Sequence, residues 1–422
     1  MKKRHLLLVL LFFLSMLTFF DRACISVAGP RMQKDLGITP VQWGWVVGAF
    51  SLAYAAFEIP TGMWGDRFGA RRVITRIVLW WSAFTALTGV VRSFGVLVAI
   101  RFLFGVGEAG AFPNISGVVS RWFPAKERAR TQGWIWTATR LGGASSAILV
   151  VPLQAAYGWR TAFWIFGSVG IFWVAIWYWW YRDSPAQISG ITQQELDEIG
   201  VQPVPQRRMP PWRQLLGSAN VRAIMLMYFC YCYAGYFFIS WLPTFLVKSR
   251  GFSERDLVVF TPLPFLFGAV SNLAGGFTGD YLVGRIGLLR ARRLIGVGAL
   301  TASGCLVLSA SVAPGKYSAI ILLSLAYACS DFMLPSAWSV CVDVGKWYSG
   351  TVSGAMNTAG QFGSFISGVL FGYMVKLFHS YDAPIAVIGV MLLISATQWL
   401  RIDATREAQA PPQPATSSAK PA

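Results

Sequence analysis

Residues 62–72 read GMWGDRFGARR, and residues 276–280 read GFTGD shortly before Arg285. Both stretches contain the pattern G-x-x-G-D, and the second copy begins 214 residues after the first, about half of the 422-residue chain. Each copy follows the second long apolar segment in a block of six. This repetition predicts a duplicated chain whose two halves share one architecture.

Apolar segments of about 20 residues fill both blocks, and each is long enough to cross a bilayer core of about 30 Å. Hydrophobic residues make up 55% of the chain and charged residues 13%, which is typical of polytopic membrane proteins. We expect an all-α membrane protein with twelve transmembrane helices in two pseudo-symmetric six-helix halves. The spans are expected near 6–30, 43–65, 73–92, 95–120, 131–156, 159–181, 219–247, 257–280, 288–313, 317–343, 348–377 and 383–401.

A long polar stretch separates the sixth span from the seventh. It contains an acidic ELDE run at 195–198 and a proline-rich run at 203–211. We therefore divide the chain into four parts. These are an N-terminal six-helix half (1–182), a cytoplasmic linker (183–218), a C-terminal six-helix half (219–402) and a disordered cytoplasmic tail (403–422).

The 36 lysines and arginines are distributed unevenly along this plan. With both termini in the cytoplasm, 24 of them lie in cytoplasmic segments, nine in outside loops and three within spans. Such an excess of basic residues on one side is the positive-inside pattern, which predicts cytoplasmic termini. The basic residues are dispersed between spans and form no single face, so the net charge of +18 does not indicate a nucleic-acid partner.

Charged side chains also stand inside the first and fourth spans, where burial is costly unless they face a cavity or each other. Asp21 and Arg22 are adjacent, so on a helix their side chains point about 100° apart. We expect Arg22 to face a central cavity and Asp21 to face a neighbouring helix, such as the fourth. Snorkelling charges near a span end are the alternative interpretation.

The fourth span contains RFLFGVGEAG at 101–110. Arg101 and Glu108 are seven residues apart and therefore share one helix face. An arginine fork can hold a carboxylate through two hydrogen bonds, while burial in the membrane favours the protonated form of a glutamate. This pairing predicts an anion ligand and a proton carrier, with Asp21 sharing protons with Glu108. A structural Arg–Glu ion pair is the alternative.

Arg140 is a third intramembrane arginine, and it leaves the N-terminal half with excess positive charge that suits an anionic solute. It can instead be tied to a neighbouring carbonyl or to Asp21. Tyr54, Trp338 and Asn357 offer polar groups for a solute, although each alone is more often a packing residue. Two further acids, Glu58 and Asp331, also lie within spans; Asp331 could take a proton or cap a broken helix near Pro335, and Glu58 has no evident partner.

The repeated motif predicts a gate at the cytoplasmic end of the helices. Its glycines allow two helices to approach closely. Its aspartate can contact a helix N-terminus, or an arginine on the other side of the helix contact, in only one conformational state of the gate. Ordinary loop charges that fix topology are the alternative. The expected gating residues are Gly62, Gly65, Asp66, Arg67, Arg71 and Asp280.

Signatures of metal and enzyme chemistry are missing from the sequence. The six cysteines form no C-x-x-C pair, and the sequence contains no G-x-x-x-x-G-K-[ST], H-E-x-x-H or G-x-S-x-G motif. We therefore expect no enzyme activity, no cofactor, no metal and no ATP-driven step.

Taken together, these motifs give the chain a family resemblance over almost its whole length except the tail. The chain resembles the anion:cation symporter family of the major facilitator superfamily, whose members carry hexuronates, galactonate, glucarate, phthalate and similar acids. The matching stretches are FDR (20–22), Tyr54, IPTGMWGDRFGARR (59–72), RFLFGVGEA (101–109), WFPAKER (122–128), GWR (158–160), RDSP (182–185), WLPT (241–244) and RGFS (250–253).

This resemblance implies proton-coupled import of an organic anion by alternating access, in a multi-pass protein of a bacterial inner membrane. It implies Arg22 and Arg101 as ligands of the substrate carboxylate and Asp21 and Glu108 as proton carriers. Tyr54, Trp338 and Asn357 would be polar contacts of the pocket. Members of the family have Gln at Glu58 and often near Arg140, so Arg140 indicates a more acidic or differently shaped substrate.

Other modes of transport, and one function other than transport, fit the same sequence. Sodium coupling or organic-anion exchange would use the same fold, and a transporter-like sensor of an organic acid is a further alternative. The expected partners are a small organic anion, protons and the lipid bilayer, with a monomer as the default state.

Overall fold

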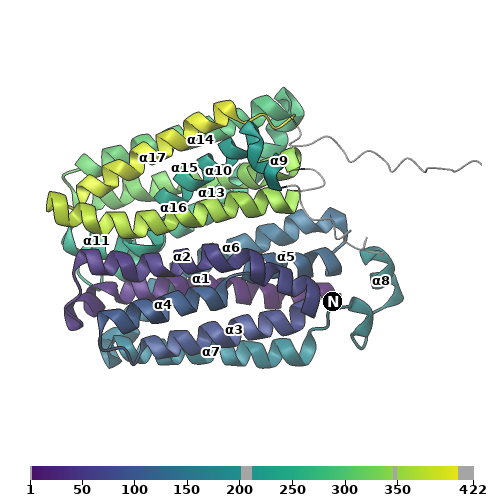
Figure 1. Ribbon diagram of the computed structural model, residues 1–422, viewed down its shortest axis with the longest axis horizontal. Coiled ribbons are helices and arrows are strands. Elements are labelled where there is room, and N and C mark those ends of the chain that lie inside the picture. The colour runs from purple at the N-terminus through teal and green to yellow at the C-terminus, as the bar shows by residue number, and fades with distance from the viewer. Residues whose placement is uncertain (1, 201–211, 346–348, 407–422) are drawn as a thin grey trace, which may run out of the picture.

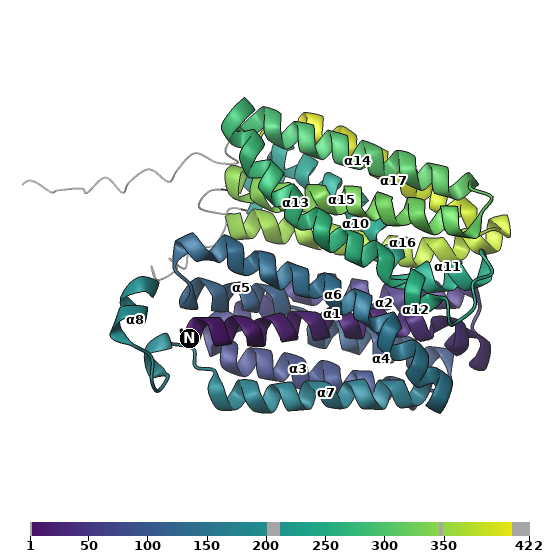
Figure 2. The same cartoon turned by 180° about the vertical axis from the view of Figure 1, so that it is seen from behind.

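The computed structural model describes residues 2–200, 212–345 and 349–406, and in these ranges the secondary structure is helical with no strand. Two groups of long, nearly parallel helices lie side by side, one from each half of the chain (Figure 1). The view from behind shows the same division (Figure 2). The expected all-α architecture in two halves is confirmed.

The helices follow the expected spans in chain order. The N-terminal half contains α1 (Lys3–Asp35), α2 (Pro40–Phe68), α3 (Ala70–Thr88), α4 (Phe94–Glu108), α5 (Ala111–Trp122), α6 (Ala125–Tyr157) and α7 (Trp159–Trp180). The connection between halves contains η1 (Pro185–Gln187), α8 (Gln193–Ile199) and α9 (Trp212–Gly217). The C-terminal half contains α10 (Ala219–Ser240), α11 (Leu242–Lys248), α12 (Leu257–Phe260), α13 (Pro262–Ile286), α14 (Leu288–Val312), α15 (Lys316–Gly345), α16 (Ser349–Phe378) and α17 (Asp382–Arg401).

Nine helical segments among the described residues are long and apolar enough to cross a membrane. The other three expected spans, near 43–65, 73–92 and 131–156, coincide with α2, α3 and α6, which are 29, 19 and 33 residues long. Each expected span thus falls on a helix, and nine of these segments have the length and composition of a membrane span.

Three of the spans are not single helices, which the sequence reading did not predict. The fourth span breaks between α4 and α5 at Gly110, whose φ of +85° is the left-handed conformation that favours glycine. The seventh and eighth spans break before Pro243 and Pro262, which lack a backbone N–H and therefore stand at the start of a new helix.

The C-terminal tail is partly ordered. Asn220 at the start of α10 donates through Nδ2 to the carbonyl of Asp403, at 2.8 Å, and the backbone N–H of Asp403 donates to Asn220 Oδ1, at 3.0 Å. The expected disorder is therefore wrong for residues 403–406, while residues 407–422 lie outside the described residues.

The two halves meet chiefly through α2 against α16 and α6 against α13. We call the end of the bundle that carries residues 35–40 and 248–257 the distal end, and the opposite end, beside α8 and α9, the linker end. At the distal end the backbones of α2 and α16 touch. A Cβ added to Gly44 would lie 2.8 Å from the carbonyl oxygen of Gly368, and one added to Gly372 would lie 2.2 Å from that of Pro40.

Polar contacts join the halves at this same end. Arg31 of α1 forms an ion pair with Glu254, which precedes α12. Lys248 Nζ donates to Gln33 Oε1 at 2.8 Å, and the Tyr236 hydroxyl of α10 donates to the carbonyl of Val47 at 2.7 Å. The distal end is therefore closed in this conformation.

Candidate substrate and proton site

A buried ion pair occupies the middle of the N-terminal half. Arg22 Nε of α1 lies 2.5 Å from Glu108 Oε1 of α4, and the two side chains are 9% and 0% exposed. Both were expected as site residues, but Glu108 was expected to share a face with Arg101, and its direct partner is Arg22. Four aromatic rings surround the Arg22 guanidinium carbon at centroid distances of 4.9, 5.1, 4.8 and 5.8 Å, namely Phe19, Phe50, Tyr54 and Phe112.

The break in the fourth span determines where Glu108 sits. Because the chain leaves the helix at Ala109, Glu108 is the last residue of α4. The carbonyl groups at a helix C-terminus carry partial negative charge. This charge attracts a cation and repels the carboxylate of a nearby acidic side chain. Arg22 therefore supplies the positive charge that offsets both the carboxylate of Glu108 and this end of α4.

Asp21 is buried beside this pair. Its Oδ1 atom has no hydrogen-bond partner among the described residues, and its carboxylate interacts electrostatically with Glu108 and Arg101. The expectation that Asp21 faces the fourth span is consistent with this arrangement. Two carboxyl groups and two guanidinium groups therefore share one buried region.

Arg101 is the cation of this region that lacks a carboxylate partner in the described part of the chain. It is 4% exposed, and its guanidinium carbon lies over the rings of Phe50 and Phe104 at 5.2 and 4.6 Å. Its Nε atom makes no hydrogen bond to a described residue, and it interacts electrostatically with Tyr236 of the other half. Arg101 thus offers unused donors close to the boundary between halves.

A second contact across the boundary between the two halves joins Asn357, an expected substrate contact, to Glu58, an acid of the second span. Asn357 Nδ2 of α16 donates to Glu58 Oε1 of α2 at 2.6 Å. The sequence reading left Glu58 without a partner, and the partner comes from the other half. Asn357 therefore has a protein acceptor in this conformation, and Tyr54, one turn before Glu58, packs against Arg22.

Arg140 crosses the boundary at a third point. Its Nε lies 2.7 Å from Asp331 Oδ2 and its Nη2 donates to Oδ1 at 2.9 Å, while the Tyr231 hydroxyl donates to the same Oδ1 at 3.0 Å. The alternatives of a carbonyl or Asp21 as the partner of Arg140 are wrong, because Asp331 takes that place. Sequence could not show this pairing, since the two residues are 191 positions apart on different halves.

Trp338 belongs to a row of aromatic rings that also crosses the boundary. Phe112 stacks on Trp136 at 5.1 Å, Trp136 lies 5.6 Å from Trp338, and Trp338 lies 6.3 Å from Tyr228. The indole Nε1 of Trp338 is buried without an acceptor among the described residues. Sequence reasoning missed Trp136, although its position four residues before Arg140 places both on one face of α6.

The first copy of the repeated motif makes a close helix contact. A Cβ at Gly65 would lie 1.7 Å from Asn114 Oδ1 of α5, so any larger residue there would have to displace the Asn114 amide. Arg71 donates through Nε to the carbonyl of Tyr178 at 3.1 Å, which ties α3 to α7 within one half. The side chains of Asp66 and Arg67, and the surroundings of Gly62, lie outside the described residues.

The second copy behaves differently. Gly276 and Gly279 have room for a Cβ, whereas at Gly275 a Cβ would lie 2.1 Å from the carbonyl oxygen of Phe332. Asp280 is exposed and forms no ion pair with a described residue. The close helix approach therefore lies one residue before the second copy of the motif.

The fold and this charged region define the class of protein. The family model for the Major Facilitator Superfamily matches residues 11–368, and the chain belongs to that family of transporters, which are not enzymes. A structure of a bacterial homologue of the human lysosomal transporter Spinster, inward-facing and unoccupied, has a TM-score of 0.76 and 20% identity over 95% of this chain and 97% of its own, which supports the fold.

Curated relatives place the chain more narrowly, in the anion:cation symporter group. It is 35% identical to a probable sulfoacetate transporter of Cupriavidus necator, over 95% of this chain and 94% of the relative. It is 30% identical to a probable galactarate/D-glucarate transporter of Escherichia coli, over 94% and 92%, and 28% identical to a hexuronate transporter of Bacillus subtilis, over 93% of each. The expected family is therefore confirmed.

Proposed function

We propose that this protein imports a small organic anion together with protons, by alternating access. The observation that carries the proposal is the buried Arg101, an unneutralised guanidinium beside the boundary of the halves. A buried charge of this kind is costly, and an anionic solute that docks on it removes the cost. The names of the relatives support an organic acid as that solute.

Coupling to protons follows from the competition for Arg22. In the present conformation Glu108 occupies the guanidinium of Arg22. A proton on Glu108 removes the negative charge that holds Arg22, and Arg22 then joins Arg101 in binding the carboxylate of the solute. Asp21 is the second proton carrier. Loss of the protons restores the Arg22–Glu108 pair and expels the anion.

Closure of the halves around the solute would use the boundary residues. Tyr54, Trp338, Asn357 and Arg140 are the proposed further contacts, with Arg140 and Asn357 released from Asp331 and Glu58 when the halves move. Gly62, Gly65, Asp66, Arg67, Arg71 and Asp280 are the proposed gate at the linker end. We place both termini in the cytoplasm, the protein in a bacterial inner membrane, and the functional unit as a monomer.

The size and charge of the solute are open to direct measurement. Sulfoacetate carries a carboxylate and a sulfonate, whereas hexuronates carry one carboxylate and a polyol chain. A thermal-shift screen of purified protein against sugar acids, dicarboxylates, aromatic acids and sulfoacetate would select among them, because a ligand that binds the folded state raises its unfolding temperature.

Uptake into proteoliposomes tests the function. With the selected acid outside and an inward proton gradient, we expect accumulation above the external concentration without sodium, and loss of accumulation when an ionophore collapses the gradient. Uptake that requires sodium, or that proceeds only against an internal organic anion, would replace the proton-coupled proposal. Absence of binding by any organic anion would refute the assignment of Arg101.

A further inference from the structure

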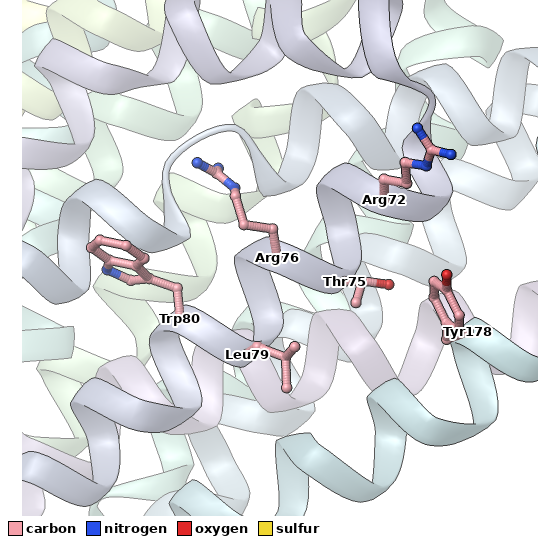
Figure 3. Close-up of a pocket in the computed structure, with 6 residues that line it drawn as sticks. All are labelled: Arg72, Thr75, Arg76, Leu79, Trp80 and Tyr178. Atoms are coloured by element: carbon pink, nitrogen blue, oxygen red, sulfur yellow. The ribbon is translucent and has the colours of Figure 1, made fainter.

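A hollow of about 500 Å³ opens on the face of the N-terminal half that is turned away from the C-terminal half. It lies near the linker end of α3 and α7 and is lined by Arg72, Thr75, Arg76, Leu79, Trp80 and Tyr178 (Figure 3). No part of the proposed transport pathway includes it. Its composition, two arginines among aromatic and apolar side chains, is unusual for a surface that faces lipid.

One of the two arginines of this hollow has donors without a partner among the described residues. Arg76 Nε and Nη2 are buried without a hydrogen-bond partner among the described residues, and its guanidinium carbon lies 4.7 Å from the Trp64 ring centroid. Arg72, one turn earlier on α3, is exposed, and its side chain extends on the same side of the helix as that of Arg76 (Figure 3). Neither Arg72 nor Arg76 forms an ion pair with a described residue, so an anionic ligand would supply the counter-charge that they lack.

A second hollow of about 570 Å³ adjoins the first across Thr75 and Tyr178, and Arg71 and Arg182 stand in its lining. In contrast to Arg76, these two arginines have protein acceptors. Arg71 donates to the carbonyl of Tyr178, and Arg182 Nη1 donates to the carbonyl of Trp179 at 2.9 Å. The linings of the two hollows thus contain four arginines, and Thr75 and Tyr178 belong to both linings.

The surroundings identify the kind of ligand. α7 presents exposed apolar side chains along its length, including Phe172 at 72% exposure and, near the linker end, Trp179 at 76%. In a membrane protein such a surface faces acyl chains, and tryptophan and tyrosine mark the headgroup level. The arginines stand near the start of α3, where a span reaches that level.

We propose that this hollow binds the phosphate of an anionic phospholipid, with Arg72 and Arg76 on the phosphate and with Leu79, Trp80 and Tyr178 against the glycerol and first acyl carbons. Basic pockets between transmembrane helices recognise anionic headgroups in this way. The site is independent of the solute and proton site, because it lies on the outer face of one half.

Lipid retention on the intact protein provides the test. Full-length protein is extracted into detergent, mixed with phosphatidylglycerol or phosphatidylcholine, and measured by native mass spectrometry. We expect selective retention of phosphatidylglycerol, weakened about five-fold for each arginine removed in Arg72→Gln and Arg72→Gln/Arg76→Gln. The matched control is Arg92→Gln, since Arg92 is an exposed arginine at the distal end and its loss should leave retention unchanged.

The outcomes are distinct. Equal retention of both lipids, or full retention by the double variant, would overturn the proposal. Binding of millimolar inorganic phosphate without any selective retention of phosphatidylglycerol would show that the hollow takes free phosphate and not a lipid, and would overturn the proposal. Arg72 is exposed, so its single variant is expected to fold and keeps the test valid if the double variant does not. Transport is not measured, so failure here leaves the proposed function untouched.

Discussion

Arg101 differs from Arg22 and Arg140 in one respect that determines its proposed role. Each of the other two intramembrane arginines has a buried carboxylate within 3 Å, at Glu108 and Asp331 respectively. Arg101 has aromatic rings instead, which stabilise its charge without using its hydrogen-bond donors. A single residue therefore combines charge, burial and free donors, the combination that an anion site needs.

The variant Arg101→Ala should lose substrate binding. A hydrogen bond to a charged group contributes about 1.5–3 kcal/mol, so we expect the KM of uptake to rise about ten-fold to one-hundred-fold or uptake to vanish. Arg92→Ala, which removes an exposed arginine, is the control. Equal KM values for the Arg101 variant and the wild type would contradict the assignment.

The variant Glu108→Gln should separate binding from coupling. Glutamine preserves the size of the side chain but cannot lose a proton, so Arg22 stays free for the solute. We expect exchange of labelled for unlabelled anion to persist while accumulation driven by a pH gradient is lost. Both activities are measured in the same proteoliposomes, and gradient-driven accumulation by the variant would assign coupling elsewhere.

Sequence identified these side chains but not their partners. Asp21, Arg22, Arg101 and Glu108 stand out because charges within an apolar span are costly. Their pairing depends on how α1 is rotated against α4, which local spacing does not determine. The Arg140–Asp331 and Glu58–Asn357 contacts join opposite halves, so only the packed structure reveals them.

Among the elements, the interrupted fourth span has the largest effect on the site. The break at Gly110 ends α4 at Glu108 and starts α5, which packs against α2, as a separate helix. The hydropathy pattern predicted the span as a whole because apolar content continues through residues 95–120. The break itself depends on a left-handed glycine and on a close contact with Thr61, which are tertiary features.

Gly110→Ala should destabilise the protein. The left-handed φ of +85° is unfavourable for alanine, and the added Cβ would lie 2.3 Å from Thr61 Oγ1. Such backbone strain costs about 1–3 kcal/mol. Thermal unfolding in detergent measures it, with Gly133→Ala as control because that helical glycine has open space at its Cβ position. An unchanged unfolding temperature for Gly110→Ala would contradict the geometry.

On the scale of the whole molecule, the duplicated plan was readable from the sequence, whereas the closed distal end was not. The repeat of G-x-x-G-D and the recurring apolar segments predicted two six-helix halves. The halves meet through α2 against α16 and α6 against α13, together with single polar contacts such as Arg31–Glu254 and Tyr236–Val47, and no sequence pattern marks these polar contacts.

The Arg140–Asp331 pair should stabilise the conformation in which the distal end is closed. Removing one partner leaves a buried charge unpaired, which costs about 3–5 kcal/mol, while removing both costs less. We therefore expect Arg140→Gln and Asp331→Asn each to lower the unfolding temperature more than the double variant does. Additive effects in this double-mutant cycle would show that the pair carries no coupling.

The linker helix α8 is attached to the start of α1 by charge. Lys2 Nζ and Arg4 Nη1 lie 2.5 and 2.8 Å from Glu198 Oε2, and hydrogen bonds from these cations lower the pKa of Glu198 from its ordinary value of 4.5. A lowered pKa means that the attachment is complete at neutral pH and is lost as the pH falls through that pKa.

Limited proteolysis of the linker measures this attachment. We expect cleavage by an acid-active protease to increase in the wild type only at a pH below 4.5, the ordinary pKa of a glutamate, as the Glu198 carboxylate takes up its proton. In Glu198→Gln the linker should be accessible at every pH, because the charge is missing throughout. A wild-type linker with the same accessibility at pH 3 and pH 7 would rule out this pH dependence.

The meeting of α2 and α16 through bare glycine backbone restricts how the distal end can part. Main-chain atoms have no rotamers, so a change of side-chain rotamer cannot separate Gly44 from Gly368 or Gly372 from Pro40. Opening must therefore separate whole helices as rigid rods, with the ion pairs and aromatic row breaking together. We therefore expect the distal end to part over the whole α2–α16 contact in a single step, without an intermediate in which only some of these glycines have separated.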